Sequence, residues 1–258
     1  LTLKGAADGR LFIRAEIGGD KPNAKLHIVV ADPADGTIVA DELLPAGMRK
    51  VRTEIATRAE HLWSPNDPYL YDVTATLEFG AAKSQGKQEK LQQESQEIQE
   101  KPAKSQEKQD IVRSYCAFRT VEIKPDLKGI ARFHLNGKPV FLKGVLDQGY
   151  WPDGLLTAPS DEALVHDIIA MKESGFTMLR KHIKIESARW YYHCDRLGML
   201  VWQDAVSGGG EYNAWVTNRK PTLMRATWNK YRDDTAKHFA ALGADDSTYR
   251  RDWSRTCD

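Results

Sequence analysis

The stretch GFTMLRKH, residues 175–182, begins like a buried segment and ends like an exposed one. Its apolar part, residues 176–179, has the length and composition of a short interior β-strand. The basic or titratable side chains of Arg180, Lys181 and His182 follow with no turn residue between. Catalytic and binding groups project from the carboxyl ends of strands in parallel α/β sheets and barrels. The stretch therefore predicts a parallel strand that delivers polar groups to a cleft.

Two further strands are predicted on either side of this stretch. The segment PVFLKGV ends in an apolar strand at about residues 141–145, and MLVW forms another at residues 199–202. Each is followed at once by polar side chains, as at residues 180–182. Polar groups at successive parallel strand ends converge on one rim. The predicted substrate-binding residues on this rim are Asp147, Arg180, His182 and Asp204.

Helices are predicted between these strands. Ser160 is a suitable N-cap for an apolar pattern of helical spacing that Gly175 ends. A second helix covers about residues 186–197 and stops at Gly198, and a third covers about residues 222–242. Strand and helix therefore alternate over residues 125–258, which predicts a parallel sheet covered by helices.

The sequence before this region follows a different pattern. Short runs that alternate apolar and polar residues are separated by turn segments such as GGDKPN and DPADG, as in an antiparallel β-sandwich. We predict such a sandwich over residues 1–124. Residues 81–109 contain almost no large apolar side chain, and this composition predicts a disordered insertion with a solvated helix as the alternative.

Charge and cysteine content exclude several classes of function. The formal net charge is +1, which gives no electrostatic reason to expect a nucleic acid or an anionic membrane surface as partner. No apolar run is long enough for a membrane span. The three cysteines, Cys116, Cys194 and Cys257, lack the spacing of a zinc site and are predicted to be plain thiols. No cofactor or metal is predicted, and the cellular location is left open.

Several ordered motifs resemble glycoside hydrolase family 2, the group of β-galactosidases, β-glucuronidases and β-mannosidases. LWSPNDPYLYDVTATL and YCAFRTVEI are similar to strands of the family's immunoglobulin-like domain, and FHLNGKPVFLKGV is similar to the start of its catalytic domain. GFTMLRKHIK and YYHCDRLGMLVWQD are similar to its second and third barrel strands. The resemblance implies an immunoglobulin-like β-sandwich followed by the first part of a (β/α)₈ TIM barrel.

The resemblance also implies a reaction and a limit. Retaining glycosidases use two carboxyl groups about 5 Å apart, one as acid/base and one as nucleophile. In the family the acid/base Glu follows an Asn at the end of the fourth barrel strand, and no Asn-Glu pair occurs in this sequence. No catalytic residue is therefore assigned, and the chain is expected to be an inactive part of a β-glycoside hydrolase. The first strand lacks the "NRHE"-like continuation of β-galactosidases, so galactose is not assumed.

The resemblance gives the rim residues individual roles. Arg180 is expected to contact a sugar hydroxyl or a catalytic carboxylate, with a structural salt bridge as the alternative. His182 contacts sugar or supports Arg180, and Lys181 alternates away from the cleft. Asp147 and Asp204 bind hydroxyls, orient Arg180 or form a structural pair. Trp151 and Trp202 are candidates for stacking on a sugar ring, whereas most other Trp residues are expected in cores.

Two classes of function remain after this reasoning. One is a carbohydrate-binding part of a glycoside hydrolase that cleaves terminal β-glycosidic bonds, and the alternative is a non-catalytic carbohydrate-binding or structural module. Nucleic-acid binding through RKHIK is disfavoured by the balanced charge. An incomplete barrel would also expose an apolar sheet, so self-association into a homo-oligomer stays open.

Overall fold

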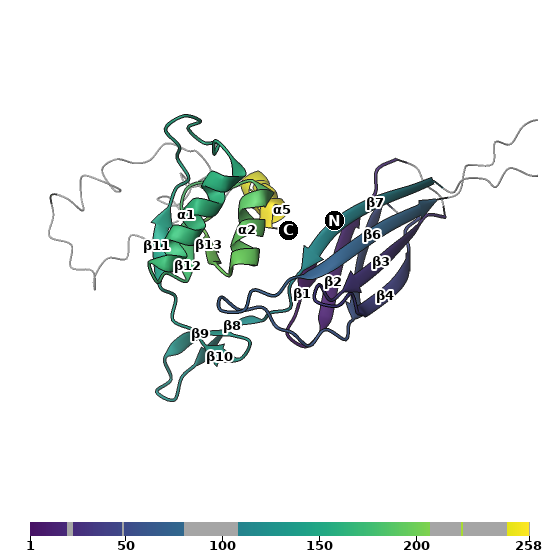
Figure 1. Cartoon of the computed structure of the whole chain (residues 1–258), viewed down its shortest axis with the longest axis horizontal. Helices are drawn as coiled ribbons and strands as arrows, with labels where there is room; N and C mark the ends of the chain where they lie inside the picture. The colour runs from purple at the N-terminus through teal and green to yellow at the C-terminus, as the bar shows by residue number, and fades with distance from the viewer. Residues whose placement is uncertain (20–22, 48, 80–107, 207–222, 224–246, 258) are drawn as a thin grey trace, which may run out of the picture. The chain divides into compact units, whose positions relative to one another are not determined.

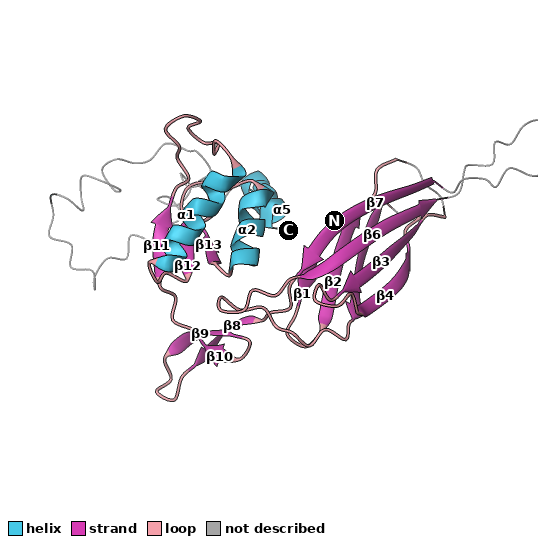
Figure 2. Ribbon diagram, in the orientation of Figure 1, coloured by secondary structure: helices cyan, strands magenta, loops and turns pink. Residues whose placement is uncertain are grey.

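A computed structural model describes residues 1–19, 23–47, 49–79, 108–206, 223 and 247–257. The chain divides into two compact units, Leu1–Phe141 and Leu142–Asp258. The described structure is mostly β-sheet with few helices, as Figure 2 shows. The predicted insertion at 81–109 lies almost wholly outside the described residues, as does the predicted helix at 222–242.

The first unit contains two antiparallel sheets that share one core (Figure 1). One sheet has the order β1-β2-β5 and the other β4-β3-β6-β7. Their strands are β1 (Thr2–Gly5), β2 (Arg10–Glu16), β3 (Lys25–Ala31), β4 (Ile38–Pro45), β5 (Lys50–Ala56), β6 (Tyr71–Phe79) and β7 (Lys108–Cys116).

The alternating sequence pattern explains how these two sheets pack. In β2 the side chains of Leu11 and Ile13 are buried while their neighbours are more exposed, and β3 buries Ile28 and Val30 in the same way. Successive side chains of a strand point to opposite faces of its sheet, so each sheet turns one apolar face inward. The buried residues of both sheets form a single cluster, which makes this part of the unit a two-layer sandwich.

A small third sheet completes the first unit. Its strands β8 (Val121–Pro125), β9 (Ala131–Leu135) and β10 (Lys138–Pro139) pair antiparallel in the order β10-β9-β8. Asn136 ties it to the sandwich, because its side-chain amide donates to the carbonyl of Trp63 and accepts from the backbone N–H of Thr120. Trp63 is fully buried, in agreement with its prediction as a core residue.

The second unit contains a parallel sheet in the order β11-β12-β13. Its described elements are β11 (Gly144–Asp147), α1 (Asp161–Glu173), β12 (Met178–Lys181), α2 (Ala188–Leu197), β13 (Leu200–Gln203) and α5 (Ser247–Cys257). Leu179 of β12 lies in one apolar cluster with Leu164 and Ile168 of α1 and Trp190 of α2. The two helices therefore cover the face of the sheet to which Leu179 points (Figure 1).

The predicted helix signals are confirmed for these two helices. Ser160 is the N-cap of α1, and its hydroxyl accepts from the N–H of Ala163. Gly175, directly after the C-cap of α1, and Gly198, the C-cap of α2, both have positive φ. Glycine is favoured there because it adopts the left-handed conformation without a steric penalty.

The predicted strand boundaries are wrong by one to three residues. The strand expected at 141–145 is β11, which begins at Gly144, and Phe141 is 79% exposed. The strand expected at 176–179 is β12, which begins at Met178 and includes Arg180 and Lys181. Charged residues were taken as marking the strand end. Within β12 these two charges point to opposite faces, and each has its own partner.

The predicted domain boundary at 124/125 cuts the small third sheet at the end of β8, whereas the division at 141/142 leaves the whole sheet in the first unit. The domain assignment stays a prediction.

Candidate functional site

Arg180 and Asp204 form a forked ion pair at the carboxyl end of the parallel sheet. The Arg180 Nη2 atom donates to Asp204 Oδ2 at 2.8 Å, and Nε lies 3.1 Å from both carboxylate oxygens. Arg180 belongs to β12, whereas Asp204 follows β13 directly. The hydrogen bonds that Arg180 donates to Asp204 raise the pKa of the guanidinium above its ordinary value. A planar guanidinium held in this way has a defined orientation at the sheet edge.

Trp202 and Leu146 occupy the same layer of the sheet as Arg180. Strand pairing places Leu146 opposite Arg180 and Arg180 opposite Trp202. Leu146 is 51% exposed and Trp202 is 44% exposed. Because Leu179 points to the helices, these three residues lie on the opposite face of the sheet. This face presents an apolar surface next to a fixed guanidinium.

Lys181 lies on the helix-covered face and is only 1% exposed. Its Nζ is 2.8 Å from Asp147 Oδ2 and 3.1 Å from Glu186 Oε1. It also lies 4.1 Å from the centre of the Trp190 ring, in cation–π geometry. Lys181 alternates away from Arg180, as predicted, but it is buried among acidic partners. Asp147 therefore pairs with Lys181 at the back of the sheet rather than with Arg180 at the front.

Glu186 extends this ion-pair network into the loop after β12. Lys184 Nζ lies 2.8 Å from Glu186 Oε1 and donates to the carbonyls of Gly149 and Leu156. Gly149 has a φ of +62°, and a Cβ on it would lie 2.1 Å from Glu186 Oε1. The loops that follow β11 and β12 are therefore joined by two lysines and one carboxylate, and a side chain at residue 149 would have to displace Glu186.

His182 contacts the last residue of β11 and the first residue of the loop that follows it. Its backbone N–H donates to the carbonyl of Asp147, and its Nδ1 lies 2.7 Å from the Nε2 atom of Gln148. The Gln148 amide nitrogen is a donor, so the Nδ1 of His182 accepts this hydrogen bond. The structure thus places His182 beside Gln148, and the described hydrogen bond of its ring does not involve Arg180.

Trp151 lies in the loop after β11, is half-buried and packs against the core of the second unit. Its Nε1 atom is buried and has no hydrogen-bond partner among the described residues. Its role in sugar stacking stays a prediction. Trp190 is 2% exposed, in agreement with its prediction as a core residue.

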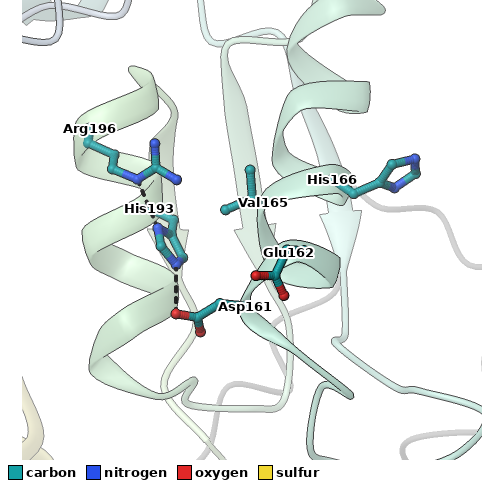
Figure 3. A pocket seen from close by; sticks show the side chains of 6 residues that line it. All are labelled: Asp161, Glu162, Val165, His166, His193 and Arg196. Atoms are coloured by element: carbon teal, nitrogen blue, oxygen red, sulfur yellow. Dashed lines mark hydrogen bonds and ion pairs between the residues drawn. The ribbon is translucent and has the colours of Figure 1, made fainter.

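A separate polar pocket of about 440 Å³ lies between α1 and α2 (Figure 3). Six residues line it: Asp161, Glu162, Val165, His166, His193 and Arg196. The Arg196 Nε atom donates to His193 Nδ1 at 2.9 Å, and His193 Nε2 lies 3.7 Å from Asp161 Oδ2. This pocket was not identified from the sequence.

The part of the chain that the structure describes holds no group of three His, Cys, Asp or Glu side chains arranged for a metal ion. None of its helices has the length and apolar character needed to cross a membrane.

Burial raises the pKa of the Cys116 thiol to about 12 and raises that of Cys194 further. Both cysteines are free and buried, as plain thiols would be.

Part of the rim could be predicted from the sequence. The position of Arg180 and Asp204 near strand ends could be inferred from the pattern of apolar strands followed by polar residues. Glu186 was missed because it lies in a loop of alternating polar and apolar residues without a recognised spacing. The signal that could have revealed it is Lys181, since a lysine at a buried strand position requires an acidic partner.

Comparisons with known proteins point to β-glycosidases. A β-galactosidase of Lactobacillus delbrueckii subsp. bulgaricus is 25% identical over 197 residues, which cover 76% of this chain and 16% of that protein. A β-mannosidase B of Aspergillus terreus is 26% identical over 228 residues, which cover 84% of this chain and 23% of that protein. The chain thus spans less than a quarter of the length of these curated relatives. No protein-family model matches it.

Solved structures give the same result. The β-glucuronidase of Parabacteroides merdae aligns with a TM-score of 0.58 at 19% identity, over 83% of this chain and 24% of that one. A β-glucuronidase of Bacteroides uniformis aligns with a TM-score of 0.53 at 25% identity, over 78% of this chain and 22% of that one. The predicted resemblance to glycoside hydrolase family 2 is confirmed over most of the chain, at low identity.

Proposed function

We propose that this chain is the part of a retaining β-glycoside hydrolase that carries an immunoglobulin-like sandwich and the first strands of a TIM barrel. The observation that carries the proposal is the forked Arg180–Asp204 pair at the carboxyl end of the parallel sheet, next to Trp202. Relatives and structural neighbours named as β-galactosidase, β-mannosidase and β-glucuronidase support it.

The strand arrangement supports the proposed domains. A three-stranded sheet packed on a four-stranded sheet, with β3 between β4 and β6, is compatible with an immunoglobulin-like fold over residues 1–124. Three parallel strands joined by α1 and α2 on one face are what the start of a barrel requires over residues 125–258. In a closed barrel the face with Arg180 would point inward.

The substrate side of this proposal rests on complementary chemistry. A sugar ring offers an apolar face and several hydroxyl groups, and Trp202 offers an exposed aromatic ring in the same layer as Arg180. The Arg180 guanidinium donates to hydroxyl oxygens, while Asp204 keeps it in one orientation. We propose Arg180, Asp204, Trp202 and His182 as sugar-contacting or sugar-positioning residues, with Asp147 acting indirectly through the loop that holds His182.

The described carboxylates at the strand ends are all committed to cations. Asp204 binds Arg180, while Asp147 and Glu186 bind Lys181. A catalytic acid has to release a proton and a nucleophile has to attack carbon, and ion-paired carboxylates that orient other residues are poorly suited to both roles. We therefore propose that the two catalytic carboxyl groups come from further barrel strands of a longer polypeptide.

An activity assay tests this proposal. The purified 258-residue chain and a polypeptide extended through the complete barrel are assayed on aryl β-galactoside, β-glucuronide and β-mannoside substrates. We expect hydrolysis by the extended polypeptide alone. Turnover by the short chain that disappears in an Asp204→Asn variant would show that the catalytic carboxylates were misplaced. Sugar binding without turnover by both proteins would favour the non-catalytic carbohydrate-binding module.

A further inference from the structure

The pocket between α1 and α2 contains a buried imidazole with an unused hydrogen-bonding atom. His193 is 7% exposed, and its Nε2 atom has no hydrogen-bond partner among the described residues. A buried polar atom without a partner is destabilising, so such atoms call for a ligand or water. In Figure 3 the ring of His193 extends from α2 toward Asp161 at the start of α1.

The hydrogen bond from Arg196 fixes the tautomer of His193. An arginine Nε always carries a hydrogen, so His193 Nδ1 has to accept the bond that spans 2.9 Å. The neutral imidazole then carries its proton on Nε2. Asp161 Oδ2 is 3.7 Å from this Nε2 atom, which is too far for a hydrogen bond. The Nε2–H group is therefore a donor that points toward a carboxylate without reaching it.

This arrangement selects the chemistry of a ligand. An ammonium group offers only donors and cannot accept from the Nε2–H of His193, and a carboxylate offers only acceptors and cannot donate to Asp161. A metal ion would need the Nε2 lone pair that the tautomer does not offer. A hydroxyl group accepts and donates through one oxygen atom, and hydrogen bonds of about 2.8 Å can reach both sides of a 3.7 Å gap.

The remaining lining residues fit a polyhydroxylated molecule. Glu162 offers a second carboxylate as acceptor, and Val165 places an apolar side chain between the two helices (Figure 3). The charges of Asp161 and Glu162 are opposed by Arg196 and by Arg189, which lies 2.9 Å from Asp161. The pocket volume of about 440 Å³ lies within the range of small-molecule sites.

We propose that this pocket is a binding site for a neutral polyol or sugar, with one hydroxyl group bridging His193 Nε2 and Asp161. The pocket lies between α1 and α2 and shares no residue with the strand-end rim. It therefore does not rest on the proposed hydrolase activity.

The experiment is a titration of the 258-residue chain, labelled with ¹⁵N-histidine, followed by long-range ¹H–¹⁵N spectra of the imidazole nitrogens. The probes are glycerol and methyl β-galactoside, which separate a simple polyol from a sugar, and acetamide as a ligand without a hydroxyl group. We expect the His193 Nε2 signal to move with glycerol or with the galactoside. No shift with either probe, or an equal shift with acetamide, would overturn the proposal.

Three variants locate the site. His193→Phe removes the donor, and its spectrum also assigns the His193 signals. Asp161→Ala is expected to weaken binding about tenfold, the effect of losing one hydrogen bond to a charged group, and it keeps the His193 signal as readout. His27→Phe is the matched control, since His27 lies in β3 of the first unit and does not line the pocket. Equal loss in His27→Phe would contradict the assignment to the His193–Asp161 pair.

Discussion

Lys181 and Asp147 are direct neighbours on adjacent parallel strands, and their side chains form an ion pair of 2.8 Å on the buried face of the sheet. Burying an ammonium group is expensive unless acidic partners and an aromatic ring compensate for the lost water. Glu186 and Trp190 complete that compensation. The pair therefore ties two strand ends together directly beneath the loops that form the rim.

Replacing Lys181 with Met should destabilise the protein by about 3 kcal/mol. The variant leaves the half-buried Asp147 without its cation, and the loss of one partner of a buried pair costs about 3–5 kcal/mol. Glu186 keeps Lys184, which places the effect at the lower end. Urea unfolding followed by Trp fluorescence measures it. Lys143→Met is the control because Lys143 is exposed, and a similar loss in that variant would contradict a special role for Lys181.

Gly149→Ala should destabilise the protein more than Gly36→Ala does. Both glycines have positive φ, so both substitutions carry the backbone cost of about 1–2 kcal/mol. A Cβ at Gly36 meets nothing within 4 Å, whereas one at Gly149 would lie 2.1 Å from Glu186 Oε1. The difference between the two unfolding free energies isolates the clash with the ion-pair network. Equal costs would show that Glu186 moves aside freely.

Arg180→Gln should weaken binding of a β-glycoside without changing the thermal midpoint of unfolding. The Arg180 side chain is 49% exposed, so its ion pair with Asp204 contributes little to stability. Its proposed contact with substrate hydroxyls would be lost. Isothermal calorimetry with aryl β-glycosides measures binding by the chain and by the extended polypeptide. Arg132→Gln is the matched control, because Arg132 is 53% exposed and pairs with Asp126 in the first unit.

The thiols of Cys116 and Cys194 should resist alkylation in the folded chain at pH 8.5. Burial raises the pKa of both groups, to about 12 for Cys116, so the reactive thiolate is scarce where a free cysteine of ordinary pKa is about half ionised. The unfolded chain loses these protons at lower pH than the folded chain, so stability should fall as pH rises above about 8.5. Iodoacetamide labelling with peptide mapping distinguishes the two sites, and rapid labelling before unfolding would contradict the burial.

The 258-residue chain should self-associate through the face of the sheet opposite α1 and α2. Exposed apolar surface on a sheet favours association, and Leu146 on this face is 51% exposed. Leu146→Ser should shift the weight-average mass in sedimentation velocity toward the monomer. Leu43→Ser is the matched control, since Leu43 is also 51% exposed but lies in the first unit. A monomeric parent chain, or an equal shift in both variants, would contradict this.

The helix caps and the order of elements in the second unit could be inferred from sequence. Ser160, Gly175 and Gly198 carry local signals, because capping and positive φ depend on a few neighbouring residues. The alternation of strand and helix predicted the parallel sheet. The family resemblance was readable because its motifs occur in a fixed order along the chain.

The ends of the strands and the partners of the charged residues were decided by tertiary structure. In the sequence, Arg180 and Lys181 both look like exposed residues at a strand end. In the structure, Arg180 is half-exposed on one face of the sheet and Lys181 is buried on the other. The difference arises because Asp147, Glu186 and Trp190 surround Lys181. They come from the neighbouring strand, a loop and a helix. Sequence determines which side chains carry charge, but only packing determines which charges lose water and therefore need a partner.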